Sequence, residues 1–141
     1  VLEFIARFVD PETQVYMRLL KSDLLDLLEA SIDGTIAPEK VEWNWGFAAN
    51  IVLASGGYPD AYQKGMKITG VEDAESDEKV VVFHAGTTFD GDLKTSGGRV
   101  LSVSAIAGNL QDAVNKAYEA VAKIHFDGMY YRKDIGHKSL V

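Results

Sequence analysis

Apolar and polar residues alternate along the first nine positions, and this pattern predicts a strand at residues 2–9. Positions 2, 4, 6 and 8 are apolar, which places Glu3 and Arg7 together on the other face. Four residues of extended chain separate their side chains by ~13 Å, too far for a salt bridge and suited to the two ends of a metal-phosphate group. Asp10 before Pro11 then predicts a helix N-cap followed by proline at the first helical position.

A helical pattern follows in residues 11–34, where apolar side chains recur at spacings of three and four. Ser22 and Asp23 offer a second N-cap, so we expect a break or a new helix there. Gly34 supplies the stop. We interpret this unit as scaffold, although free backbone N–H groups in its first turn are able to hold an anion.

The second half of the chain reads as strands followed by a helix. Buried or β-branched strands are expected at residues 47–55, 79–88 and 97–108, with a further strand in the tail at 126–137. Asp90-Gly91 predicts a tight hairpin turn, and Asn109 with Asp112 resembles a capping box opening a helix at 111–124. The expected class is therefore α+β, with a small antiparallel sheet and one packed helix.

The amino-acid composition and net charge argue against several classes of function. The 141 residues carry 47% hydrophobic and 25% charged side chains, typical of globular protein, and a net charge of −7 argues against a general nucleic-acid binder. No run approaches the ~20 apolar residues of a membrane span, and no signal peptide is recognisable. The absence of cysteine excludes disulfides and sulfur-ligated zinc, which fits a cytoplasmic protein.

Two segments have competing interpretations. Trp43 and Trp45 either form a platform on which a ligand stacks or, in the interpretation that we prefer, pack against the face of a domain. The acidic run at 72–78 is interpreted as a solvated loop.

Three side chains in the second half are candidates for ligand contact. Arg99 follows two glycines, so its guanidinium is able to present a bidentate fork to a phosphate, with Lys94 as support. His84 is either a neutral hydrogen-bonding group in the same site or an ordinary residue at a strand end. Arg132, Lys133 and Asp134 are interpreted as a structural ion-pair set.

Several segments carry a family resemblance. The run EFIARFVDPETQ resembles the EFNxRFGDPE segment of the phosphoribosylamine-glycine ligases, which are ATP-grasp enzymes of purine biosynthesis. LASGGYPDAYQKG, ITG, VFHAGT, SGGRVLSVSA and FDGMYYRKDIG agree with the same family in order. The resemblance implies a C-terminal part of such a ligase, with residues 1–36 ending the ATP-grasp domain and residues 37–141 forming a small β-rich domain.

The resemblance also implies roles for individual residues. Glu3 would hold the metal, Mg²⁺ or Mn²⁺, and Arg7 would face the phosphate that is transferred from ATP. Asp10 and Glu12 would contact substrate, or else serve as N-cap and first-turn charge. The chain departs from the family pattern at Ile5, which replaces a metal-binding asparagine, and at Val9, which replaces a glycine.

The implied function is ATP-dependent amide formation between glycine and 5-phosphoribosylamine. The implied binding partners are glycine, phosphoribosylamine and ATP, and we expect neither nucleic acid nor a membrane as a partner. The alternative is a folded module without catalysis of its own, acting as a scaffold or interaction partner. The apolar opening strand also offers an edge for self-association.

Overall fold

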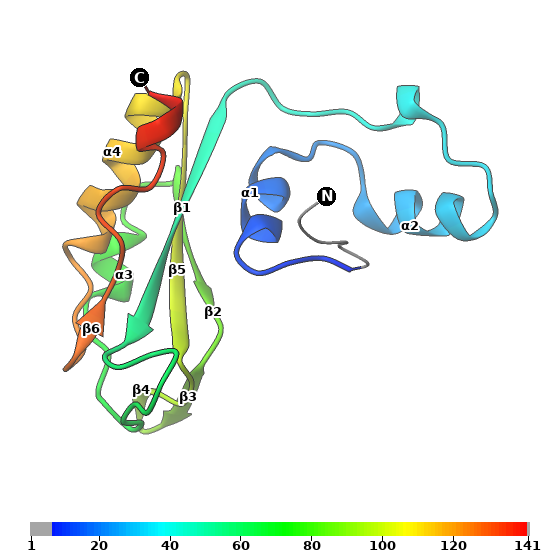
Figure 1. Cartoon of the computed structure of the whole chain (residues 1–141). Coiled ribbons are helices and arrows are strands. Elements are labelled where there is room, and N and C mark those ends of the chain that lie inside the picture. Colours follow the sequence, from blue (N-terminus) through cyan, green and yellow to red (C-terminus); the bar gives the residue numbers. More distant parts are fainter. Residues whose placement is uncertain (1–6, 141) are drawn as a thin grey trace.

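The computed structural model describes residues 7–140, and an antiparallel sheet forms its centre (Figure 1). The strands lie in the order β2-β5-β1-β6, with bounds Val80–His84, Arg99–Ala107, Phe47–Ser55 and Met129–Tyr130. Each neighbouring pair is antiparallel. The predicted α+β class and the strand at 47–55 are confirmed.

The hydrophobic core lies between this sheet and helix α4 (Leu110–Val121). Ile51 on β1 and its register partner Val103 on β5 are fully buried there, because alternate residues of a strand share one face. The helix begins where the sequence predicts, since the Asn109 side chain accepts from the Asp112 N–H and donates to the Asp112 carboxylate.

Helix α1 (Glu12–Leu19) covers the opposite face of the sheet (Figure 1). The predicted N-cap at Asp10 is wrong: Pro11 takes the N-cap position, and the Asp10 carboxylate is held instead by two side chains described below. Residues 7–9 of the predicted opening strand do not form a β-strand, and residues 2–6 lie outside the described part of the chain.

Helix α2 (Leu24–Ile32) and the short helix η1 (Pro38–Lys40) form an arm at the side of the sheet (Figure 1). Asp23 is the N-cap of α2, as predicted, and accepts hydrogen bonds from the N–H groups of Leu25 and Asp26. Gly34, just beyond the helix, has φ +67°, the left-handed conformation in which glycine commonly ends helices.

The expected strand at 79–88 is interrupted at Ala85-Gly86. Its first part is β2, whereas the second part is β3 (Thr87–Asp90), which pairs with β4 (Asp92–Thr95) in a separate two-stranded sheet. The N–H groups of Ala85 and Gly86 still bond to carbonyls at the start of β5, so the chain leaves β5 only after Gly86. The predicted hairpin turn at Asp90-Gly91 is confirmed.

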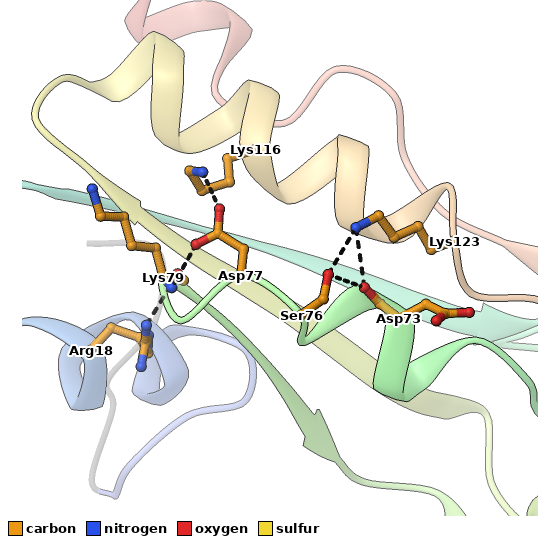
Figure 2. Close-up of polar contacts among 7 residues, drawn as sticks. All are labelled: Arg18, Asp73, Ser76, Asp77, Lys79, Lys116 and Lys123. Atoms are coloured by element: carbon orange, nitrogen blue, oxygen red, sulfur yellow. Dashed lines mark hydrogen bonds and ion pairs between the residues drawn. The ribbon is translucent and has the colours of Figure 1, made fainter.

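The acidic segment is mostly exposed, as predicted, but it is not a loop throughout. It forms the short helix α3 (Val71–Ala74) and a turn that runs between α4 and α1 (Figure 2). Asp77 pairs with Lys116, and the Lys123 ammonium donates to the Asp73 carbonyl and the Ser76 hydroxyl. Lys116 of α4 and Lys123, just beyond the end of that helix, therefore anchor the acidic turn.

The same turn also contacts the helix on the other face of the sheet. Arg18 of α1 donates to the carbonyl of Lys79 at 3.1 Å, immediately before β2 (Figure 2). Burial lowers the pKa of the Arg18 guanidinium. The turn thus links the helices of both faces.

Candidate functional site

Arg99 and Asp10 meet where the first helix and the sheet come together. Arg99 is the first residue of β5, and its Nε lies 3.1 Å from the Asp10 carboxylate while its Nη1 donates to the Asp10 carbonyl at 3.1 Å. Both side chains remain about one-third to one-half exposed, at 34% for Asp10 and 44% for Arg99. The tertiary structure thus brings together two of the residues predicted to bind substrate.

Two residues not singled out by the sequence reasoning support this contact. Gln14, one turn into α1, donates its amide to the second Asp10 oxygen at 2.7 Å. Asn50 of β1 donates to the Pro11 carbonyl at 3.2 Å. A buried asparagine in the otherwise apolar strand FAANIVLAS was the signal that could have identified Asn50, because buried amides need partners.

The contact between α1 and the sheet is unusually polar for a protein interior. Asn50 faces the helix, and its register partner Ser104 shares that face. Within residues 7–140, every buried side-chain N or O atom without a hydrogen-bond partner belongs to this layer: Gln14 Oε1, Arg18 Nε, Asn50 Oδ1, Ser102 Oγ and Ser104 Oγ. Few direct polar contacts therefore position helix α1, which begins two residues after Asp10.

The two glycines before Arg99 serve close packing. A methyl group at Gly98 would overlap the Tyr58 ring, and one at Gly97 would lie 3.0 Å from the Cα atom of Gly86. The glycine-rich turn at residues 56–62 thus packs directly beside the chain that presents Arg99. These glycines place the Arg99 backbone against its neighbours and do not leave it unobstructed.

Glu12 and Arg7 lie near the same end of α1 without joining the ion pair. Glu12 is exposed and borders an open hollow of about 300 Å³, whose other walls include Asn50, Val114 and Ile135. Arg7 is exposed, and its Nη1 donates to the Phe8 carbonyl at 2.9 Å. Glu3, the predicted metal ligand, and Ile5 fall outside the described residues.

The remaining predicted site residues lie toward the β3-β4 hairpin. The Nδ1 of His84 is 3.1 Å from the Thr87 hydroxyl, and Lys94 is 3.3 Å from the Asp90 carboxylate. Neither side chain forms a hydrogen bond or ion pair with Asp10 or Arg99 in the described structure. Each of these two residues therefore has a local partner of its own, apart from the Asp10–Arg99 pair.

Other sequence interpretations have mixed outcomes. Arg132 and Asp134 form the predicted ion pair, 2.7 Å apart on the surface. Trp43 and Trp45 are 53% and 86% exposed, so neither is buried against this part of the chain. Among residues 7–140 no three His, Asp or Glu side chains gather as a metal site requires, and no helix there is long and apolar enough to cross a bilayer.

Comparisons with known proteins agree with one another. The family described as phosphoribosylglycinamide synthetase, C domain, matches residues 48–138. A phosphoribosylamine–glycine ligase of Chlorobaculum tepidum is 53% identical over 99% of this chain and 33% of its own length. A bifunctional purine biosynthetic protein of Dictyostelium discoideum is 46% identical over 99% of this chain and 17% of its own.

A solved structure shows the same arrangement of the chain. The crystal structure of the phosphoribosylamine–glycine ligase from Thermotoga maritima superposes with a TM-score of 0.79 at 39% identity, covering 95% of this chain and 32% of that one. The chain thus spans about a third of the length of the ligases it matches. On the match to residues 48–138, this chain belongs to the phosphoribosylglycinamide synthetase C-domain family.

Proposed function

We propose that this chain works as the C-terminal part of a phosphoribosylamine–glycine ligase. In this reaction the γ-phosphoryl group of ATP is transferred to the glycine carboxylate, and the phosphoribosylamine nitrogen then attacks the acyl carbon. Phosphate leaves as the amide forms and a proton is lost from nitrogen. The observation that carries the proposal is 53% identity with such a ligase across 99% of the chain.

Arg99 is the proposed contact for the 5-phosphate of phosphoribosylamine. Its guanidinium already holds one carboxylate, that of Asp10, and remains 44% exposed. A phosphate dianion carries more charge than a carboxylate and is able to accept from both N–H groups that now contact the carboxylate and the carbonyl of Asp10, so it competes with Asp10 for the guanidinium. Asp10 would then be released to accept a hydrogen bond from the substrate amine, with exposed Glu12 as a second acceptor.

The other site residues are proposed from the family resemblance. Arg7 would neutralise charge on the transferred phosphoryl group, while His84 and Lys94 would hydrogen-bond the ribose phosphate from the hairpin side. When bound, Mg²⁺ or Mn²⁺ would neutralise charge on the ATP phosphates. Glu3 would contribute one ligand, but the described residues do not themselves assemble a metal site.

A second function applies to the chain in isolation. It spans a third of the ligases it matches, while residues 47–140 include a complete core around the sheet. Alone, the chain would therefore be a folded, noncatalytic module, and amide formation would belong to the complete ligase in a cytoplasmic setting.

The experiment uses the Chlorobaculum tepidum ligase with its matching third replaced by this chain. We expect ADP formation that requires both glycine and phosphoribosylamine, whereas the 141-residue chain alone should release none. A chimera that elutes as a folded protein, binds ATP and still forms no amide would overturn the ligase proposal. Turnover by the isolated chain would overturn the noncatalytic one.

A further inference from the structure

The strand that carries Arg99 contains a β-bulge next to that residue. β1 and β5 pair one to one as far as Leu53 opposite Leu101. The next residue of β1, Ala54, lies opposite Arg99, so Val100 is the extra residue of the bulge. The Val100 side chain is fully buried in the hydrophobic core. Core packing therefore fixes the position of the extra residue.

The bulge decides on which face of the sheet Arg99 lies. Asn50 of β1 faces α1, and Ala54 lies on the same face because it is four residues further along the strand. Directly opposite residues share a face, so Arg99 also faces α1, and its guanidinium meets Asp10 there. Without the bulge, Arg99 would lie opposite Ser55 and its side chain would point to the face that α4 covers.

Ser55 holds the chain in this shifted register. Its N–H donates to the Gly98 carbonyl at 2.8 Å, and its hydroxyl donates to the Gly97 carbonyl at 2.9 Å. Both carbonyls that directly precede Arg99 are therefore bonded to one residue of β1. Ser55 lies inside the sheet, since Met129 of β6 pairs with it on the other side, and it is 4% exposed. Hydrogen bonds in such a buried place are costly to lose.

We infer that Ser55 is a positioning residue for Arg99. Its hydroxyl is buried and already bonded, so it acts on the ligand only through the backbone of Gly97 and Gly98. That backbone leads into the bulge, which directs the Arg99 guanidinium to the start of α1. The role in ligand binding rests on the phosphate contact proposed for Arg99.

The first test uses the isolated chain and needs no ligand. Ser55→Ala removes the hydroxyl but keeps the N–H bond to Gly98, so we expect the sheet to form with Arg99 held less firmly. In NMR spectra of the labelled chain, the Nε–H of Arg99, 3.1 Å from Asp10 in the parent, should exchange with water roughly 2- to 10-fold faster. Arg99→Lys identifies this signal by removing it. An unchanged exchange rate in Ser55→Ala would overturn the inference.

Ser102→Ala is the matched control for this measurement. Ser102 lies on β5 and is 3% exposed, and its hydroxyl has no hydrogen-bond partner within residues 7–140. Its removal should leave the exchange of the Arg99 Nε–H unchanged. Should Ser55→Ala fail to fold, Ser55→Cys keeps a similar volume with a weak donor, and the same faster exchange is expected of it.

The second test measures ligand affinity in the Chlorobaculum tepidum chimera, with ribose 5-phosphate as the probe. Ser55→Ala should weaken binding roughly 2- to 10-fold without changing the affinity for ATP. Ser55→Thr retains a hydroxyl and should recover the affinity. In the Arg99→Ala background, Ser55→Ala should cause no further loss, because its effect passes through Arg99.

The outcomes separate this inference from the proposed function. A Ser55→Ala loss of equal size with and without Arg99 overturns the positioning role and leaves the phosphate contact standing. Arg99→Ala with the affinity of the parent rejects the phosphate contact instead. Faster exchange of the Arg99 Nε–H in Ser55→Ala would then still support the structural role of Ser55 in holding Arg99.

Discussion

The Nε of Arg99 lies 3.1 Å from an Asp10 carboxylate oxygen, which joins the first residue of β5 to the residue before Pro11 and α1. Eighty-nine positions separate the two residues in the chain, and the Asp10 carbonyl accepts a second hydrogen bond from the same guanidinium. Because both side chains are partly exposed, the pair is open to competition from an external anion. The Asp10–Arg99 pair therefore holds the start of α1 against β5, and it also contains the arginine that we propose binds the phosphate.

Replacing Arg99 by alanine should weaken phosphate binding. Loss of a charge-assisted bidentate contact costs about 1.5–3 kcal/mol, so the affinity of the active chimera for a ribose 5-phosphate ligand should fall by roughly 10- to 150-fold. Arg99→Lys keeps the charge without the fork and should fall between the two. Isothermal titration calorimetry measures the change.

Arg132→Ala is the control for Arg99, because Arg132 is a surface arginine paired only locally with Asp134. Its phosphate affinity should equal that of the parent. Equal affinity in the Arg99→Ala protein would remove Arg99 from the phosphate site.

Two buried hydroxyl groups should respond differently to removal. Ser104 is fully buried and its hydroxyl has no partner in the described structure, so Ser104→Ala should change the free energy of unfolding by no more than ~0.5 kcal/mol, or stabilise the protein. The equally buried Thr95 hydroxyl accepts from the Met66 N–H at 3.1 Å. Thr95→Val leaves that donor without its acceptor and should cost about 1–3 kcal/mol.

Urea denaturation of both variants compares these costs directly. If Ser104→Ala were as damaging as Thr95→Val, the hydroxyl would have to be bonded through water, and the layer beneath α1 would be tighter than we describe.

The Asp77–Lys116 pair should make the stability of the folded protein depend on pH in the acidic range. The hydrogen bond from Lys116 is the main cause that lowers the pKa of Asp77, and the backbone N–H of Lys79 adds to it. Because the pKa of Asp77 is lower in the folded state, the pair stabilises the protein at pH values above the pKa of Asp77 in the unfolded state, ~3.9. This stabilisation is lost as the pH falls through the pKa of Asp77 in the folded state. In Lys116→Met the pKa of Asp77 should rise, and stability should depend less steeply on pH below ~4.

The control is Lys123→Met, since Lys123 bonds to Asp73 and Ser76 in the same turn and not to Asp77. Carboxyl chemical shifts followed by NMR should give an Asp77 pKa unchanged by that substitution. A pKa that stayed low in Lys116→Met would assign the effect to the backbone of the turn.

Local patterns predicted the elements that depend on neighbours in sequence. The strand at 47–55, the caps at Asp23 and Asn109, and the turn at Asp90-Gly91 are formed by residues within a few positions of one another, so periodicity and side-chain chemistry were sufficient. The same reasoning gave the antiparallel sheet and its packed helix. The family resemblance, carried by short ordered motifs, is confirmed by the comparisons.

Contacts between distant residues were decided by the fold. Asp10 has an ordinary capping position in the sequence, but Arg99 from β5 and Gln14 occupy its carboxylate once α1 lies on the sheet. Most of the acidic segment is exposed, as predicted, but its Asp77 is paired with Lys116 of α4, which lies 39 positions away in the chain. Tertiary packing pairs charges that no spacing rule relates, because their separation in space is independent of their separation along the chain.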